Sequence, residues 1–137
     1  MSVFVDTSAW FAAAYSADRG NRRAKEILRA ETGFLTSDHV LVETWYLLRH
    51  RIHREAAETF WRQLRSGVAQ IETVRPADLE VASDLGSEFP DQDFSIVDRT
   101  SFAVMLRLGV HRVVSFDDDF AVFRFGPGRR RAFEVLR

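Results

Sequence analysis

The sequence predicts an α/β fold with a mostly parallel sheet of four to five strands. Two features of the chain support this prediction. Short apolar runs that are typical of buried strands alternate with segments whose apolar residues recur at helical spacing. Strands that alternate with helices usually pair in parallel, through right-handed crossovers. The chain has 137 residues, 46% of them hydrophobic, so we expect a single domain that spans residues 1–137.

The first half of the chain begins with the apolar run Val3-Phe4-Val5, which we expect to be a buried strand. Thr7 or Ser8 then offers a hydroxyl that can cap a helix. Apolar residues at helical spacing, separated by glycine or polar residues, place the elements that follow. We expect helices at residues 9–15, 21–30, 39–49 and 54–65, and a second strand at residues 34–36.

In the second half, two helix starts have a clear physical basis. Pro76 suits a first helical turn, because the N–H that it lacks would have no partner there. Ser95 and Asp98 form the Ser-x-x-acid pattern of a capping box, and Gly109 ends the helix that they start. We expect strands at residues 69–74, 112–115 and 132–136, and helices at residues 76–87 and 95–108.

Four carboxylates occupy related places in this scheme. Asp6 follows the first strand and Asp117 follows the fourth. Asp98 lies in the first turn of the helix that leads into the fourth strand, and Glu43 lies about one turn into the helix after the second strand. In parallel sheets, ligands bind beyond the carboxyl ends of the strands. If the first and fourth strands are neighbours, the four side chains can converge at that edge.

Carboxylates that are brought together repel one another, and a hard divalent cation removes the repulsion. Mg²⁺ and Mn²⁺ prefer oxygen ligands, and such ions promote the hydrolysis of phosphodiesters. Each acid also has an ordinary interpretation. Asp6 can cap a helix, Asp98 can complete the capping box, Asp117 can belong to a solvated turn, and Glu43 can be a surface residue. The hypothesis of a metal site depends on their joint placement.

Composition and missing motifs exclude other chemistry. The chain has no cysteine, so disulfides, thiolate zinc sites and a cysteine nucleophile are excluded. Its histidines lack His-Glu-x-x-His spacing, and no glycine-rich phosphate loop is present. A net charge of −1 argues against a protein that simply coats nucleic acid. Neither a signal peptide nor a membrane-spanning run is found, and we expect a cytoplasmic protein without a membrane partner.

The acids lie in four motifs that together resemble the PIN-domain ribonucleases. The motifs are Val-Phe-Val-Asp6-Thr-Ser-Ala-Trp, Val-Leu-Val-Glu43-Thr, Asp93-Phe-Ser-Ile-Val-Asp98-Arg-Thr-Ser-Phe-Ala-Val-Met and Val-Ser-Phe-Asp117-Asp-Asp-Phe. Their order and spacing are similar to those of VapC-type toxins from bacterial toxin–antitoxin pairs. The resemblance extends from Val3 to about Phe133.

The resemblance implies a three-layer α/β/α sandwich and an acidic pocket that binds Mg²⁺ or Mn²⁺ and hydrolyses RNA. By matched position, it makes Asp6 and Asp98 the principal metal ligands. Glu43 and Asp117 are the remaining acids, acting directly or through water. Secondary candidates are the hydroxyl of Thr7 or Ser8, the acid Asp93, and Asp119, which competes with Asp117 for the last position.

The resemblance also implies partners. They are an RNA substrate, a small antitoxin protein and a second copy of the chain, with a larger toxin–antitoxin assembly as a further form. Apolar helix surfaces around residues 45–48 and 60–64 are candidates for protein contacts, although most of their side chains are also candidates for the core. Arg129, Arg130 and Arg131, in a glycine-rich turn, are the better candidates for contacts with RNA phosphates. The arginine cluster at residues 49–54 is a second candidate, for which a solvated surface is an equally good interpretation.

Two other functions remain open at this stage. One is a housekeeping PIN nuclease that matures RNA, or a flap-type nuclease that cuts DNA. The other is a PIN-like binding module without catalysis, against which the complete set of acids argues. A short neighbouring gene for a DNA-binding antitoxin would favour the toxin.

Overall fold

A five-stranded sheet forms the centre of the structure, a computed structural model that describes residues 1–137. The strand order is β3-β2-β1-β4-β5, and every neighbouring pair is parallel. The predicted α/β class, the parallel sheet and the pairing of the first strand with the fourth are confirmed. The strands are β1 (Val3–Val5), β2 (Phe34–Ser37), β3 (Gln70–Glu72), β4 (Arg112–Val114) and β5 (Glu134–Leu136).

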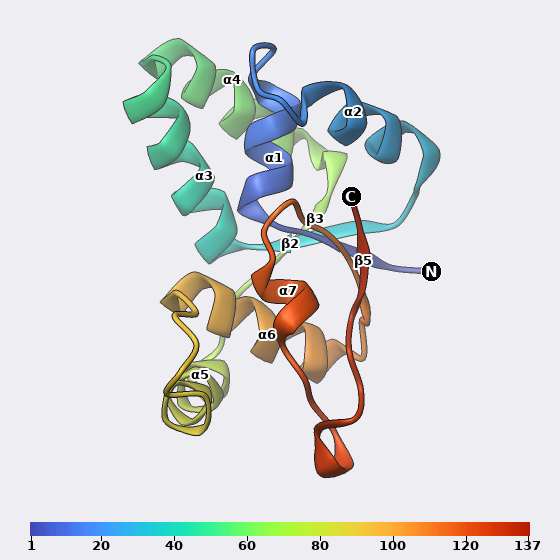
Figure 1. The fold of residues 1–137 in the computed structure, drawn as a ribbon. Coiled ribbons are helices and arrows are strands. Elements are labelled where there is room, and N and C mark those ends of the chain that lie inside the picture. Colours follow the sequence, from blue (N-terminus) through green and yellow to red (C-terminus); the bar gives the residue numbers. More distant parts are fainter.

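Helices cover both faces of the sheet and give the molecule three layers. In Figure 1, α1 to α4 lie on one side of the strands, and α5 and α6 lie on the other. The helices are α1 (Thr7–Ala14), α2 (Asn21–Ala30), α3 (Asp38–Arg51), α4 (Arg54–Gln63), α5 (Pro76–Glu88), α6 (Ile96–Leu108) and the short α7 (Asp119–Val122). No helix has both the length and the apolar character needed to cross a membrane.

Three local features differ from the sequence prediction. The first helix starts at Thr7 rather than at residue 9. Of the caps that the sequence offered, the structure uses the carboxylate of Asp6, which accepts from the Ser8 N–H, and not the hydroxyl of Thr7 or Ser8. The helix predicted to reach residue 65 ends at Gln63, and a π-helical turn follows in which Gly67 has a φ of 102°. The short helix α7 was not expected.

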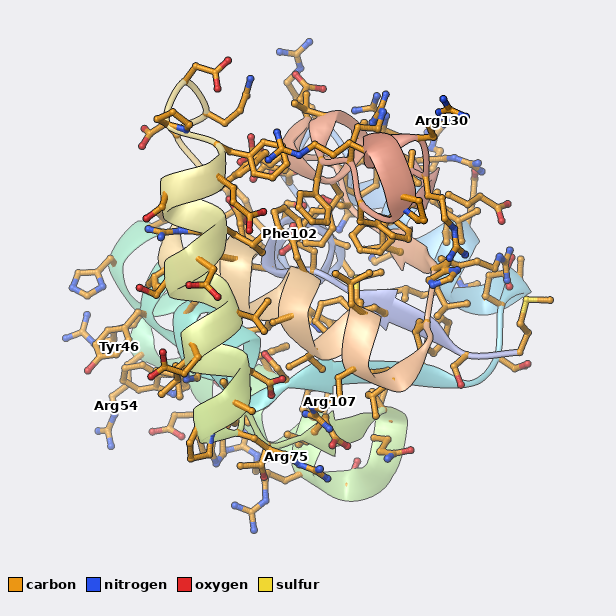
Figure 2. All side chains as sticks on the ribbon, turned by 90° about the horizontal axis from the view of Figure 1, so that it is seen from below. Tyr46, Arg54, Arg75, Phe102, Arg107 and Arg130 are labelled. Carbon is orange, nitrogen blue, oxygen red and sulfur yellow. The ribbon has the colours of Figure 1, made fainter.

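The core on the α6 side of the sheet is built largely of phenylalanine. The rings of Phe102 and Phe123 stack with centroids 4.2 Å apart, and Phe102 meets Phe120 edge to face at 5.0 Å. All three side chains are buried. Figure 2 shows Phe102 inside the molecule, while Tyr46, Arg54 and Arg130 project from its surface. Aromatic pairs of this kind stabilise beyond their area burial, so the cluster holds α6 and α7 firmly together.

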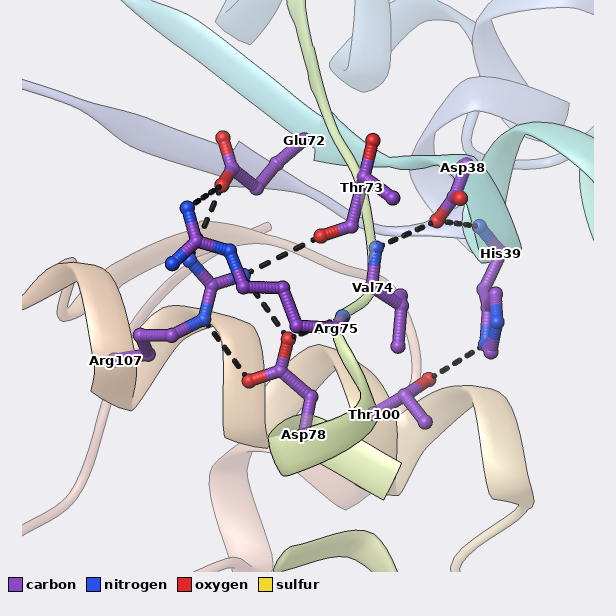
Figure 3. Close-up of polar contacts among 9 residues, drawn as sticks. All are labelled: Asp38, His39, Glu72, Thr73, Val74, Arg75, Asp78, Thr100 and Arg107. Atoms are coloured by element: carbon purple, nitrogen blue, oxygen red, sulfur yellow. Dashed lines mark hydrogen bonds and ion pairs between the residues drawn. The ribbon is translucent and has the colours of Figure 1, made fainter. Parts of the chain in front are cut away.

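A partly buried network of ion pairs fixes α5 and α6 to the edge of the sheet (Figure 3). The Arg107 guanidinium donates to both carboxylate oxygens of Asp78, at 3.0 Å each, and to Glu72 at the end of β3, at 3.1 Å. Asp78 also accepts from the Arg75 N–H at 2.8 Å. Burial alone would raise the pKa of Asp78, but these hydrogen bonds and the Arg107 charge hold it below its usual value. Asp78 is therefore ionised and depends on Arg107.

We expect Arg107→Met to lower the free energy of unfolding by about 3 kcal/mol, because it leaves the buried Asp78 carboxylate without its cation. The measurement is urea denaturation at neutral pH. Arg23→Met is the matched control, since the Arg23–Glu26 pair is about half exposed and is worth less than about 1 kcal/mol. Equal losses in the two variants would contradict this account of the network.

Candidate active site

The parallel pairing of β1 with β4 places Asp6 beside Ser115. Val5 is in register with Val114, so the next residue of each strand emerges at the same edge of the sheet. The Ser115 hydroxyl donates to Oδ2 of Asp6 at 2.9 Å, and the Ser8 hydroxyl donates to the same oxygen at 2.9 Å. Asp6 is only 2% exposed. Two serines therefore hold a buried carboxylate at the carboxyl end of the central strand.

A capping box sets the position of Asp98. Its backbone N–H donates to the Ser95 hydroxyl at 3.0 Å, and its Oδ2 accepts from the Ser95 N–H at 3.1 Å. The predicted box is thus confirmed. Asp98 is buried, at 7% exposure, in the first turn of α6. Its ordinary role as a helix cap engages Oδ2 and leaves Oδ1 outside the box.

Asp98, Asp117 and Asp119 form a compact group of carboxylates. One carboxylate oxygen from each lies within 4.8 Å of the others, a spacing that suits a shared metal ion. Asp118, which lies between Asp117 and Asp119 in the sequence, points away from this group. It is highly exposed and accepts from the Arg137 guanidinium at 2.9 Å. The sequence left Asp117 and Asp119 as competitors, whereas the structure brings both to Asp98.

A cavity of about 470 Å³ opens over these acids. Its lining includes all four principal candidates and the secondary candidates Thr7, Ser8, Asp93 and Asp119. Seven of its 14 lining residues are acids, and Arg51 is the one basic residue. The Thr7 hydroxyl is buried and has no hydrogen-bond partner in the protein. The cavity is therefore strongly acidic and rich in oxygen donors.

Burial and mutual repulsion make the central acids hard to ionise. Burial raises the pKa of Asp6 to about 6, although hydrogen bonds from Ser8 and Ser115 oppose the rise. Burial also raises the pKa of Asp98, and the neighbouring carboxylates of Asp119 and Asp6 raise it further. Burial and the charges of Asp119 and Asp118 raise the pKa of Asp117. A cation among these groups would remove the repulsion.

The donor set fits a hard divalent metal ion. Carboxylate oxygens are the ligands that such ions prefer, and no nitrogen or sulfur ligand lines the cavity. Asp98, Asp117 and Asp119 are close enough to share one ion, and Asp6 and Glu43 line the same cavity. Asp6 and Asp98 also keep structural roles as helix caps, so the two interpretations of these acids hold together.

Two polar residues of the site were missed by the sequence prediction. Ser115 binds Asp6, and Asp18 lines the cavity. Arg51 also lines the cavity. It belongs to the arginine cluster at residues 49–54, whose proximity to the acids was not predicted. Ser115 could have been found, because it follows β4 as Asp6 follows β1. Asp18 comes from the loop after α1 and Arg51 from the last turn of α3, and neither stands in a recognisable motif.

The arginine turn lies away from the cavity. Arg129 packs over the Phe89 ring at 4.4 Å, and Arg131 over the Phe125 ring at 5.1 Å. Arg130 is exposed and points away from the body of the molecule (Figure 2). None of the three lines the acidic cavity. Their contact with RNA stays a prediction.

Comparison with known proteins identifies the family and the fold. The family model for the PIN domain matches residues 3–126, which include all of the acids described above. The chain belongs to the PIN-domain family. The resemblance drawn from the four motifs is thereby confirmed, as is the assignment to the nuclease class of enzymes.

The PIN domain of this chain is similar to VapC20 of Mycobacterium tuberculosis, which is named a 23S rRNA-specific endonuclease. The two are 38% identical over 125 residues, which cover 90% of this chain and 95% of VapC20. The crystal structure of VapC20, described as a toxin that cleaves the sarcin–ricin loop, matches with a TM-score of 0.84 and 35% identity over 87% of this chain and 92% of VapC20. A chain of a toxin–antitoxin complex from Klebsiella pneumoniae shares the fold, with a TM-score of 0.64 and 16% identity. The match covers 88% of this chain and 91% of the chain in that complex.

The raised pKa values predict how the stability of the metal-free protein changes with pH. The folded chain keeps the proton of Asp6 at pH values at which the unfolded chain has lost it, so the contribution of Asp6 to stability is greatest below about pH 4. This contribution is lost as the pH rises through about 6. Between these limits we expect the wild type to lose about 3 kcal/mol relative to Asp6→Asn. The measurement is urea denaturation in EDTA across this pH range.

Because the pKa of Asp98 is also raised, Asp98→Asn should gain stability relative to the wild type in the same way, and the gain should continue to higher pH. Asp118→Asn is the control, since that carboxylate is exposed and has its own arginine. If the difference in free energy of unfolding between the wild type and Asp6→Asn does not change with pH, burial does not raise the pKa of Asp6.

Proposed function

We propose that this chain, as a single domain, is an endoribonuclease toxin that hydrolyses a phosphodiester bond of ribosomal RNA. One observation carries the proposal. A relative named for cleavage of 23S rRNA is 38% identical and is matched over 95% of its length. The acidic cavity supports the same conclusion from geometry, since it gathers oxygen ligands at the edge of a parallel sheet where such folds bind ligands. Ribosomal RNA would make the cytoplasm its place of action.

The proposed cofactor is Mg²⁺ or Mn²⁺. Asp6 and Asp98 would be its principal ligands, with Asp117, Asp119 and Glu43 acting directly or through water. Such an ion, when bound, activates water and stabilises the negative charge that develops on the phosphate. The cluster of three acids and the all-oxygen lining support this choice over zinc, which favours nitrogen and sulfur.

The residues around the acids would keep them in place. Ser115 and Ser8 bind Oδ2 of Asp6, which fixes the orientation of the carboxylate and leaves Oδ1 for another partner. Ser95 does the same for Asp98. Groups that support metal ligands in this way raise affinity and activity. Thr7, with its unpaired hydroxyl, supplies one further donor or acceptor beside Asp6.

The proposed protein partner is an antitoxin, and the candidate surface is a groove between α3 and α4. It is lined by Val42, Trp45, Tyr46, Trp61 and Glu58 and has a volume of about 340 Å³. Val42 and Tyr46 are 45% and 55% exposed. Leu48, Phe60 and Leu64, which the sequence also offered for this contact, are instead core residues. A homodimer and a larger assembly with the antitoxin belong to the same proposal.

We expect Asp98→Asn to reduce Mg²⁺-dependent cleavage by more than about a hundredfold, because it removes a charged ligand of the ion. The substrate is a synthetic RNA hairpin with the sequence of the sarcin–ricin loop, and gel electrophoresis of end-labelled RNA measures the rate. Asp118→Asn is a matched control, because it changes an adjacent acid that lies outside the cavity. We expect its rate to stay within about twofold of the wild type.

Three results would contradict the proposed activity. They are cleavage by Asp98→Asn at the wild-type rate, cleavage that persists in EDTA, and no cleavage of ribosomal RNA by the wild type. Cleavage of a DNA flap in place of RNA would favour the alternative PIN nuclease. Sequencing of the RNA ends then locates the bond that is cut.

In cells, we expect strong induction of the wild type to arrest growth, because cleavage of ribosomal RNA stops translation. Asp98→Asn should permit growth, and Asp118→Asn should arrest it as the wild type does. Growth curves with matched protein levels on immunoblots provide the measurement. Arrest by all three proteins would mean that toxicity does not come from catalysis.

A further inference from the structure

One face of α3 carries both an acid of the cavity and its single basic residue, Arg51. Glu43, Leu47 and Arg51 are four residues apart and all line the cavity. Residues at this spacing share one face of a helix, and Arg51 lies about 12 Å further along the axis than Glu43. The helix thus places a cation at the rim, at some distance from the carboxylates.

The Arg51 guanidinium is free to bind a ligand. It forms no ion pair with the seven acids of the cavity and no side-chain hydrogen bond, although an arginine carries five N–H donors. Its charge lies instead over the Phe11 ring, 5.5 Å from the ring centre. Arg107 and Arg112, by contrast, are occupied by two carboxylates each. Arg51 is exposed and steadied by an aromatic face that leaves its donors open.

The charge of the cavity favours such a group. An RNA strand is a polyanion, and to reach the central acids it would enter a cavity lined by seven acidic residues. A bound metal ion offsets this repulsion only at its own position. Arginine offers a planar fork that matches a phosphate. At the rim, its reach suits a phosphate beside the one that is cut rather than that phosphate itself.

Arg51 also has an ordinary role open to it, because cations stabilise the last turn of a helix. Arg49 lies in the same last turn, is exposed and does not line the cavity. Both arginines can stabilise the end of the helix, but only Arg51 lines the cavity. A comparison of variants at the two positions therefore distinguishes helix stabilisation from ligand binding.

We propose that Arg51 is a substrate-positioning residue that binds an RNA backbone phosphate next to the scissile one and holds the strand across the acidic cavity. The inference rests on the proposed ribonuclease function. Because the contact is with a phosphate, it adds affinity for RNA of any sequence. The contact acts on binding of the strand and leaves the chemical step to the acids.

Binding of RNA tests the proposal without cleavage. The protein is the full chain with Asp6→Asn and Asp98→Asn, in Mg²⁺, and the probe is a fluorescent hairpin of the sarcin–ricin sequence. Adding Arg51→Gln should weaken binding about tenfold and reduce the slope of log Kd against log salt by about 0.7 to 1. Adding Arg49→Gln should change neither value appreciably, and Arg51→Lys should recover most of the affinity.

Cleavage by the protein with native acids provides the second measurement. Under single-turnover conditions, Arg51→Gln should raise the half-saturating protein concentration about tenfold and leave the maximal rate within about twofold. Thermal unfolding of Arg51→Gln should match that of Arg49→Gln. If Arg51→Gln and Arg49→Gln have the same RNA affinity and salt slope, the proposal is wrong.

The two proposals fail in different ways. A wild type that binds the hairpin but does not cleave it contradicts the proposed function, while the binding series still decides the role of Arg51. Loss of maximal rate with unchanged affinity in Arg51→Gln would contradict the positioning role and leave the nuclease activity intact. If the protein with Asp6→Asn and Asp98→Asn does not bind the hairpin, the inference is also overturned, since no phosphate contact would then exist.

Discussion

The parallel pairing of β1 with β4 is the contact on which the site depends. Both strands are only three residues long, and both run toward the same edge of the sheet. The register that aligns Val5 with Val114 puts Asp6 and Ser115 side by side, although they are 109 residues apart in sequence. A shift by one residue would turn one of these side chains to the opposite face. Backbone pairing therefore places the first two residues of the site, and the helices that follow the strands bring the remaining acids.

This assembly concentrates negative charge, and the fold tolerates it by giving each buried carboxylate a second task. Asp6 caps α1 and binds two serines, and Asp98 completes the capping box of α6. These hydrogen bonds favour the ionised forms, whereas burial opposes them more strongly, and the pKa of each acid rises. The stabilising interactions thus offset only part of the electrostatic cost. What remains is a site that gains free energy when a cation enters, so the same residues that shape the helix ends create affinity for a metal ion.

Sequence patterns reached the parts of this arrangement that local rules control. The capping box of Ser95 and Asp98, the apolar run before Asp6 and the alternation of strands with helices are properties of neighbouring residues, and the structure has all three. The arginine cluster at residues 49–54 was a candidate for phosphate contacts, but local rules could not tell which arginine lies at the acids. That depends on the path of α3, which brings Arg51 to the cavity. The cap of α1 was left open between a hydroxyl and Asp6, since the rule that favours serine and threonine also admits aspartate, and the structure uses Asp6. Arg129 and Arg131 looked free as a basic run, but their guanidinium groups pack on phenylalanine rings.

The three consecutive acids after β4 show how a distant contact resolves what local sequence leaves open. Asp119 begins α7, and Phe123 follows it by four residues, as Phe102 follows Asp98 in α6. The two rings stack almost in parallel, at 9° and 4.2 Å. Each ring lies one helical turn after its acid, so the stacking of the rings brings the starts of the two helices together. This accounts for the close approach of Asp98 and Asp119. Asp118, one residue earlier, turns outward to Arg137. The phenylalanine core thus sets the spacing of the acids, and a substitution there would alter the site without touching a carboxylate.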